Sequence, residues 1–343
     1  MVRNKIVIND FQKHQTIFNQ RTGFQLRIEK TKGENLVWNE FGPELIDISI
    51  TNWCDQSCIF CYKNSNSFGK NIEIGDLQII LEQARKMKVL QIALGGGNPN
   101  QHPQFIEILR MIRQDYDIVP SYTTNGRGLT EEILEATHNY CGAVAVSAYR
   151  PYIELKQSIK KFSDKGIRTN IHFLLTSESV QTAINWLTNP PDFFERINAI
   201  IFLNYKPVGN NPNLGLLANK SLSLQKFFTL VNKKHKFKIG FDSCSISGVA
   251  QYLSISPIFI DSCEAGRFSL YISEDSKMYP CSFLINKLEG VQITDNNIQS
   301  TWQNNPSFIA MRNELPSSNC KNCTSYEICN GGCSLFPEIN ICK

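Results

Sequence analysis

The chain has 343 residues, of which 42% are hydrophobic and 19% are charged, and its formal net charge is +4. This composition suits a globular protein with one large core or two ordinary ones. The mild charge, without a polybasic run, argues against a nucleic-acid-binding protein. The N-terminal residues MVRNKIVINDFQKHQ are too polar for a signal peptide, and no apolar run is long enough to cross a bilayer, so we expect a cytoplasmic protein.

Cysteine is abundant, with twelve residues in the chain. In a reducing compartment a disulfide framework is not expected. Metal binding is therefore the better explanation for these thiols.

The first segment, residues 1–42, contains short runs rich in β-branched and aromatic residues. The turn Arg21–Thr22–Gly23 separates two such runs in IFNQRTGFQLRIE, a pattern typical of a β-hairpin. Because the segment is short for an independent domain, we expect it to form a cap on the larger domain that comes after it in the chain.

Residues 43–210 alternate between apolar strands and amphipathic helices. Such a series predicts an α/β fold with a parallel sheet and right-handed crossovers, closed or partly closed into a (β/α)6 barrel. Ligands bind such barrels at the carboxyl ends of the strands. The predicted strands are 45–50, 90–94, 118–123, 143–147, 168–175 and 199–204, and the predicted helices are 76–86, 104–113, 130–138, 152–165 and 179–188.

Two further regions lie C-terminal to the barrel. Residues 211–260 predict a bridge with a helix near 224–233 and a strand near 236–241, after a loop at 208–220. Residues 261–343 are rich in Cys, with short strands at 268–273 and 277–281. This last region has too few apolar repeats for a large core, so we expect cross-links to stabilise it.

The stretch TNWCDQSCIFCYK follows the first predicted barrel strand and carries Cys54, Cys58 and Cys61 in a C-x3-C-x2-C array. Three thiolates on one loop can hold three corners of an iron–sulfur cube and leave the fourth iron open. A zinc knuckle or a set of buried thiols is the alternative interpretation.

A glycine run, Gly95 to Gly97, followed by Asn98 and Pro99, ends the second predicted strand. Adjacent glycines let a ligand approach the backbone and expose its N–H and C=O groups. The amino and carboxylate groups of an amino-acid-like ligand suit such a surface. The alternative is that these glycines form only a turn.

Together, the three-Cys loop and the GGNP turn resemble the radical S-adenosylmethionine (radical SAM) superfamily. The resemblance implies that the three Cys bind a [4Fe–4S] cluster, whose fourth iron is chelated by the methionyl amine and carboxylate of SAM. It places Phe60 near the adenine, and Gly96, Gly97 and Asn98 in a motif that contacts the methionyl amine. Asn98 stands where the family usually has Glu, which keeps hydrogen bonding but removes a charge.

Two further sites match places where family members contact the ribose of SAM. Thr124 lies in TTNG at 123–126, and Ser147 lies in AVAVSAY on the fourth strand. For Ser147 the alternative is an ordinary hydroxyl at a strand end. His172, on the fifth strand, is expected to be a packed or hydrogen-bonded core residue.

The C-terminal Cys residues resemble the SPASM extension of radical SAM enzymes, which holds two auxiliary iron–sulfur clusters. Its core is C-x2-C-x5-C-x3-C at 320–333. The resemblance supplies only three thiolates for the first of these clusters, and its fourth ligand could be Cys244, a non-Cys side chain, water or substrate. Structural zinc is the competing interpretation. The resemblance assigns Cys263, Cys281 and Cys333 to the first auxiliary cluster and Cys320, Cys323, Cys329 and Cys342 to the second.

Three other residues carry separate expectations. Asp242, in GFDSCSISG, follows a strand expected at the barrel mouth, where some members of the resembled group use an acid as general base. A carboxylate that caps a turn is the alternative. Cys141 is expected to be a buried thiol without chemistry. Ser276 replaces a Gly of the family pattern in a turn.

The resemblance implies reductive cleavage of SAM to a 5'-deoxyadenosyl radical, which abstracts hydrogen from a substrate. A ribosomally synthesised peptide with a leader is the expected substrate, modified by cross-linking, epimerisation or oxidation. A separate peptide-recognition protein and an electron donor such as flavodoxin or ferredoxin are the expected partners. The alternatives are a radical SAM enzyme acting on a small molecule and a non-catalytic zinc-binding interaction protein.

Overall fold

A computed structural model describes residues 5–32, 36–218, 221–313, 320 and 322–342. The N-terminal segment forms a three-stranded antiparallel sheet in the order β1 (Ile6–Asp10), β2 (His14–Asn19) and β3 (Gln25–Glu29). The hairpin predicted around residues 21–23 joins β2 to β3, and β1 adds a third strand.

The main sheet has six consecutive parallel strands, each expected from an apolar run. Its neighbours follow chain order, and β10 (Lys238–Phe241) pairs in parallel with the last of the six. The predicted α/β fold with a partial barrel is therefore confirmed. The six strands are β4 (Leu45–Thr51), β5 (Gln91–Gly96), β6 (Val119–Thr124), β7 (Ala143–Ser147), β8 (Thr169–Leu175) and β9 (Ala199–Asn204).

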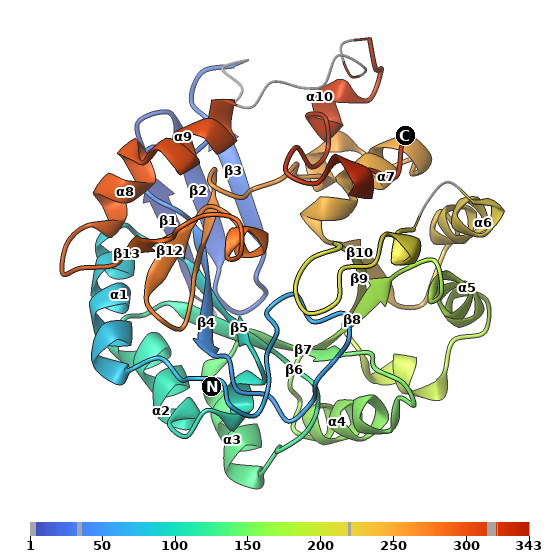
Figure 1. Ribbon diagram of the computed structural model, residues 1–343, viewed down its shortest axis with the longest axis horizontal. Coiled ribbons are helices and arrows are strands. Elements are labelled where there is room, and N and C mark those ends of the chain that lie inside the picture. The colour runs from blue at the N-terminus through green and yellow to red at the C-terminus, as the bar shows by residue number, and fades with distance from the viewer. Residues whose placement is uncertain (1–4, 33–35, 219–220, 314–319, 321, 343) are drawn as a thin grey trace.

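Six helices cover the outer face of this curved sheet and lie along its rim in Figure 1. Their apolar faces pack on the strands and form one continuous core. Side-chain caps start two of them, because Thr130 accepts from the amide of Ile133 and Ser221 from that of Leu224. The helices are α1 (Ile74–Lys86), α2 (Phe105–Arg110, continued by a π-turn over Met111–Asp115), α3 (Glu131–Tyr140), α4 (Ile153–Asp164), α5 (Val180–Thr188) and α6 (Leu222–Val231).

The sheet continues into the Cys-rich C-terminal region. Strand β11 (Ser269–Ile272) pairs in parallel with β4, and β12 (Lys277–Tyr279) and β13 (Val291–Gln292) follow as antiparallel neighbours. The sequence predicted strands here but not their union with the barrel sheet, because pairing between segments more than 200 residues apart leaves no local pattern. Four helices were not predicted: α7 (Ile246–Tyr252) in the bridge, and α8 (Ile298–Asn304), α9 (Pro306–Asn313) and α10 (Tyr326–Cys329) in the C-terminal region.

Short 3-10 turns connect many of these elements. They span Pro99–Gln101, Asp192–Arg196, Leu214–Leu216, Ser243–Ser245, Pro257–Phe259, Ser282–Leu284 and Pro337–Ile339.

A buried carboxylate joins the N-terminal sheet to the rest of the chain. Glu44, just before β4, accepts hydrogen bonds from Thr16 Oγ1 at 2.6 Å and Arg27 Nε at 2.7 Å. Arg27 also forms an ion pair with Glu264 in the C-terminal region. One guanidinium therefore bridges three parts of the chain. A buried ion pair contributes only when its partners satisfy one another in this way.

Within the described residues, every helix is too short or too polar to cross a membrane.

Candidate active site

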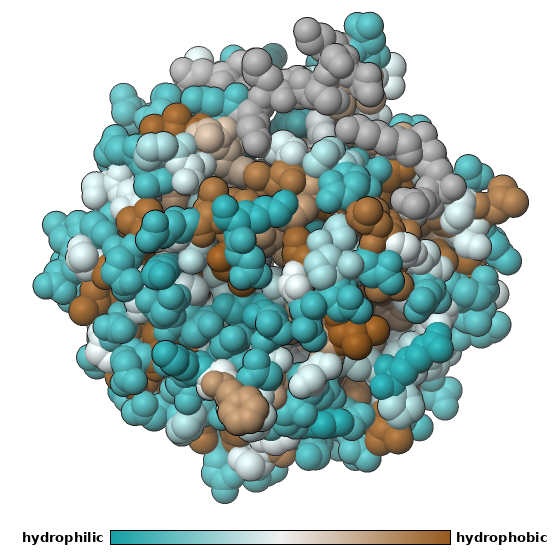
Figure 2. Space-filling model, viewed as in Figure 1, coloured by the Kyte–Doolittle hydropathy of each residue, from teal (hydrophilic) through white to brown (hydrophobic). Residues whose placement is uncertain are grey.

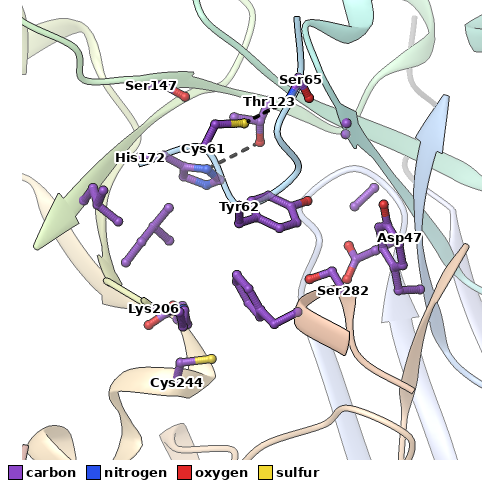
Figure 3. Close-up of a pocket in the computed structure, with 18 of the residues that line it drawn as sticks. Asp47, Cys61, Tyr62, Ser65, Thr123, Ser147, His172, Lys206, Cys244 and Ser282 are labelled. Atoms are coloured by element: carbon purple, nitrogen blue, oxygen red, sulfur yellow. Dashed lines mark hydrogen bonds and ion pairs between the residues drawn. The ribbon is translucent and has the colours of Figure 1, made fainter. Parts of the chain in front are cut away.

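A cavity of about 540 Å³ opens at the carboxyl ends of the barrel strands and extends toward the C-terminal region. On the face shown in Figure 2, apolar side chains gather in the central upper part and polar ones dominate below them. The lining mixes aromatic and aliphatic side chains with a few ionisable groups, as is usual for a ligand site. The close-up in Figure 3 shows ten of the lining residues by name.

The three-Cys loop forms one wall of this cavity. Cys54, Cys58 and Cys61 all line it, and their thiols are not in disulfides. The amide of Cys54 donates to Asn66 O at 3.0 Å, and that of Cys61 donates to Cys58 O at 3.1 Å. The backbone therefore holds the loop in a compact form along the cavity wall.

Burial and, to a smaller extent, the negative charges of Cys61 and Cys54 raise the pKa of Cys58 to about 11. Burial likewise raises the pKa of Cys54. Three thiolates are therefore costly here unless a cationic group binds them. Metal ligation of the loop would remove that cost.

The spacing of the thiols distinguishes between two kinds of metal site. Across the part of the chain that the structure describes, no three Cys, His, Asp or Glu side chains converge closely enough to hold one metal ion. A structural zinc ion requires such convergence, because Zn–S bonds are about 2.3 Å long. A cubane cluster accepts each thiolate at a separate corner. Three thiols on one loop would supply three of the four corners of such a cluster.

The glycine turn after β5 is fastened to the Cys loop. The amide of Gly97 donates to Thr51 O at 2.7 Å, and that of Asn98 donates to Trp53 O at 3.0 Å. A Cβ atom on Gly96 would lie 2.0 Å from Thr51 O, and one on Gly97 would lie 1.9 Å from Trp53 O. These glycines permit close contact between two backbone segments, in addition to lining the cavity as expected.

Asn98 lies beneath the cavity surface and is completely buried. Its Oδ1 accepts from Thr124 Oγ1 and from the amide of Asn125, both at 3.1 Å. Its Nδ2 donates to Gln101 Oε1 at 2.8 Å and to Arg127 O at 3.3 Å. The side chain is thus fully hydrogen-bonded within the protein, and Asn98 is not among the cavity-lining residues.

The TTNG segment after β6 is tied to the same structures. Thr124 lines the cavity, but its hydroxyl also donates to Asn100 Oδ1 at 2.6 Å. Asn125 Nδ2 donates to Asp55 Oδ1 in the Cys loop at 2.9 Å. These contacts align the ends of β5 and β6 with the loop, so three strand ends form one rigid wall.

Another part of the cavity wall is aromatic and polar. The rings of Phe60 and Tyr149 lie 5.6 Å apart, and both line the cavity together with Ser147. His172 also lines it, with Nδ1 3.4 Å from Thr123 Oγ1, as Figure 3 shows. Burial lowers the pKa of His172 to about 4, so the imidazole is neutral at pH 7. The sequence predicted a hydrogen-bonded core residue; the hydrogen bond is present, but the side chain faces the cavity.

Two ionisable residues of the cavity were missed by the sequence analysis. Asp47, on β4, lies across the cavity from the Cys loop, and burial raises its pKa to about 7, with a further contribution from the charge of Glu264. Lys206, after β9, is also nearly inaccessible to solvent. Neither belongs to a motif. The only signal in the sequence was a charged residue within or beside a buried strand.

Lys206 pairs with Asp242, the proposed acid at the barrel mouth. Its Nζ lies 2.6 Å from Asp242 Oδ2, and Ser245 Oγ donates to Oδ1 at 2.7 Å. The amide of Asn204 adds a third donor at 3.1 Å. Asp242 does face the cavity, and its carboxylate is also the centre of a hydrogen-bonded turn. The position of Asp242 is therefore compatible both with an acid at the barrel mouth and with a carboxylate that caps a turn.

The C-terminal Cys residues fall into two groups. Cys263 and Cys281 line the cavity. Burial raises the pKa of both thiols, and the charges of neighbouring thiols, including Cys333, contribute to the rise. The other group contains Cys320, Cys329 and Cys342. Burial, together with the charges of Cys342 and Cys320, raises the pKa of Cys329 to about 11. Cys323 is exposed.

Cys141 differs from all of these. It is buried between α3 and β7 and does not line the cavity.

Known proteins share the sequence pattern and the fold of this chain. Residues 48–187 match the model of the radical SAM superfamily. The chain is 22% identical over 318 residues to mycofactocin maturase MftC from Mycobacterium tuberculosis, and the match covers 85% of this chain and 78% of that protein. Crystal structures of Streptococcus suis SuiB share its fold. The SAM-bound form gives a TM-score of 0.73 at 16% identity, covering 99% of this chain and 98% of that one. The form bound to precursor peptide SuiA gives 0.74 at 15% identity, with coverage of 97% and 95%.

Proposed function

Residues 48–187 form a radical SAM domain, and from this we propose that the protein is a radical SAM enzyme that modifies a ribosomally synthesised peptide. The observation that carries the proposal is the position of the three thiols. They lie on the loop that leaves the carboxyl end of the first barrel strand, and all three residues line the cavity. Backbone hydrogen bonds join the start of this loop to the glycine turn of the next strand.

Cys54, Cys58 and Cys61 would hold a [4Fe–4S] cluster with one iron free for SAM. When bound, this pair supplies a 5'-deoxyadenosyl radical that removes hydrogen from an unactivated carbon. The loop itself offers Phe60 for the adenine, and the end of β7 offers Ser147 for the ribose, as the family resemblance implies. Thr124 and Asn98 support this site by fixing the strand ends, and the methionyl group is left to the backbone around Gly96 and Gly97.

The protein's own contribution is to position the substrate and to exclude water. Aromatic side chains on several walls, among them Tyr62, Tyr149 and Phe283, make much of the cavity apolar. Such a lining offers few hydrogen donors to a reactive species and keeps water from competing with the target C–H bond. Asp242 is the candidate general base.

A peptide substrate is supported by two relatives. MftC is a mycofactocin maturase, and SuiB has been crystallised with its precursor peptide. We propose the same class of substrate here, with a leader that the protein or a separate recognition partner binds. The bond that is formed, whether a cross-link, an epimerised centre or an oxidised residue, is decided by the geometry of that peptide in the cavity.

The two C-terminal groups of Cys would hold auxiliary iron–sulfur clusters. Cys263, Cys281 and Cys333 would bind the first, and Cys320, Cys323, Cys329 and Cys342 the second. A flavodoxin or ferredoxin would supply electrons. The twelve free thiols suit the cytoplasm, where such clusters are assembled and thiols stay reduced.

The experiment is incubation of the anaerobically reconstituted protein with SAM, a reductant and candidate precursor peptides, followed by mass spectrometry. A mass change confined to the peptide, together with 5'-deoxyadenosine, supports the proposal. Formation of 5'-deoxyadenosine with modification of a small molecule only would favour the small-molecule alternative. A colourless protein that contains zinc and no sulfide would refute both.

A further inference from the structure

Cys244 lies outside every Cys motif of the chain, yet the structure places it beside the first C-terminal group. It is the middle residue of the 3-10 turn Ser243–Ser245 after β10, and it lines the same cavity as Cys263 and Cys281. In Figure 3 its side chain points into that cavity. Cys244 also packs against the same small apolar cluster as Cys333. Four thiols from four separate segments of the chain therefore lie in the same neighbourhood, at one end of the cavity.

Hydrogen bonds between side chains and the backbone fix this arrangement. The side chain of Asn204 donates to Cys244 O at 3.1 Å and to Ile339 O at 3.0 Å, which ties the Cys244 turn to the segment after Cys333. A second bond, from the amide of Ile341 to Ser247 Oγ at 3.0 Å, joins the same two segments. The proximity of Cys244 to the group thus does not depend on one flexible side chain.

The electrostatics of the thiols agree with this geometry. The pKa of Cys244 is raised to about 12, mainly by burial. The charges of Asp242 and Cys263 contribute to this rise, and the positive charge of Lys206 acts against it. The charge of Cys244 in turn raises the pKa of Cys281 and of Cys333. Each of these thiols therefore lies within electrostatic reach of the others.

We propose that Cys244 is the fourth protein ligand of the auxiliary cluster held by Cys263, Cys281 and Cys333. This inference rests on the proposed function, because it presumes that the group binds an iron–sulfur cluster. Among Cys residues outside the motifs the alternative is Cys141, which lies between α3 and β7 and does not reach the cavity.

The assignment has a chemical consequence. A cluster with four thiolates has no open iron, so the substrate does not bind to it directly and its role is limited to electron transfer. The ammonium of Lys206 lies close enough to the Cys244 thiol to act against the rise in its pKa. Hydrogen bonds and positive charge near a ligating sulfur favour the reduced cluster. Lys206 would then tune the potential of this cluster from beside the substrate cavity.

The test uses the full chain with Cys54, Cys58 and Cys61 replaced by Ala, so that only the auxiliary clusters remain. Into this background we would introduce Cys244→Ala, Cys244→Ser or, as the matched control, Cys141→Ala. Each protein is reconstituted under anoxia, its iron and sulfide are measured, and it is then oxidised mildly and examined by electron paramagnetic resonance. A cubane with a corner that lacks a thiolate loses that iron and gives the signal of a [3Fe–4S] cluster.

We expect about eight irons per chain in the background, from two four-iron clusters, and little [3Fe–4S] signal. The signal should rise at least fivefold in Cys244→Ala, rise in Cys244→Ser and stay unchanged in Cys141→Ala. The inference is overturned if the background already gives the full signal, or if the Cys244 variants resemble it.

A measurement on the background alone covers the case in which a Cys244 variant does not fold. Added cyanide should leave the spectrum of the reduced auxiliary clusters unchanged, because no iron is open, and a shift would overturn the inference. Retention of only four irons would overturn it as well and would count against the first auxiliary cluster. The radical SAM assignment would survive that result, since formation of 5'-deoxyadenosine tests it separately.

Discussion

The amide of Gly97 donates a hydrogen bond to the carbonyl oxygen of Thr51 over 2.7 Å. This bond joins the turn after the second barrel strand to the start of the loop that carries Cys54, Cys58 and Cys61. Two segments that stand apart in the sequence as separate motifs are therefore one structural unit, and a change in either segment should be felt by the other.

Gly97→Ala should displace the Cys loop. The new methyl group would lie 1.9 Å from Trp53 O, a clash that only a backbone shift relieves. We expect a loss of about 3 kcal/mol in the free energy of unfolding and a lower iron content at the first cluster. Chemical denaturation and iron analysis measure these effects. Gly95→Ala is the control, since nothing lies within 4 Å of its added carbon. Equal behaviour of the two variants would contradict the structural role of Gly97.

Phe60→Ala should weaken the binding of SAM. A base stacked on an aromatic ring gains about 1–3 kcal/mol, so we expect the dissociation constant to rise about tenfold. Equilibrium dialysis of the reconstituted protein with labelled SAM gives this value. Phe68→Ala serves as the control, because Phe68 follows the same loop but is 93% exposed. If both variants bind SAM as the unmodified protein does, Phe60 does not contact the adenine.

Asp47→Asn should stabilise the protein, increasingly so as the pH rises from about 4 to 7. Burial raises the pKa of Asp47 from 3.8 to about 7. In that interval the unfolded chain has released the proton that the folded chain keeps, so folding is penalised more as the pH rises. Above pH 7 the penalty is constant, and about 4 kcal/mol is its upper bound, which water in the cavity reduces.

Urea unfolding of matched preparations at several pH values tests the Asp47 prediction. The advantage of the variant should be absent near pH 4 and largest at pH 8. An advantage that is the same at every pH, or that grows on acidification, would show that Asp47 is not held in its protonated form.

Lys206→Met should destabilise the folded protein by about 3 kcal/mol, because it leaves the Asp242 carboxylate in the cavity wall without its counter-ion. The double variant Lys206→Met/Asp242→Asn should recover most of this loss, since neither charge then remains. Thermal and chemical unfolding of the two single variants and the double variant form a complete cycle. Additive losses would mean that the two side chains do not interact appreciably.

The alternating strands and helices of the barrel could be predicted, because each leaves a pattern in a short stretch of sequence. Contacts between segments that are distant in the sequence could not. The strands at 143–147 and 199–204 were predicted with their observed bounds, because each is a short apolar run between turn-forming residues. The pairing of β11 with β4 was not predicted, since it depends on a register between residues near 270 and 46 that no local pattern encodes.

The candidate site follows the same division. Cys54, Cys58 and Cys61 could be found from their spacing, which brings the ligands of one loop together in any fold that contains the loop. The cavity positions of Asp47 and Lys206 depend on which face of a strand end is enclosed by other segments. Likewise, Asn98 uses all of its hydrogen-bonding groups on Thr124 and neighbouring residues only because the strand ends pack together. Neither these cavity positions nor the hydrogen bonds of Asn98 can be inferred from residue type alone.

The central claim is that the thiols at positions 54, 58 and 61 hold a cluster that cleaves SAM, and the most direct measurement is 5'-deoxyadenosine formed under strict anoxia with excess reductant. The account predicts that the reconstituted protein forms it, and that a variant with all three Cys replaced by Ala forms none while keeping the iron of its C-terminal clusters. Equal product from the variant and the unmodified protein, or no product from either, would contradict it.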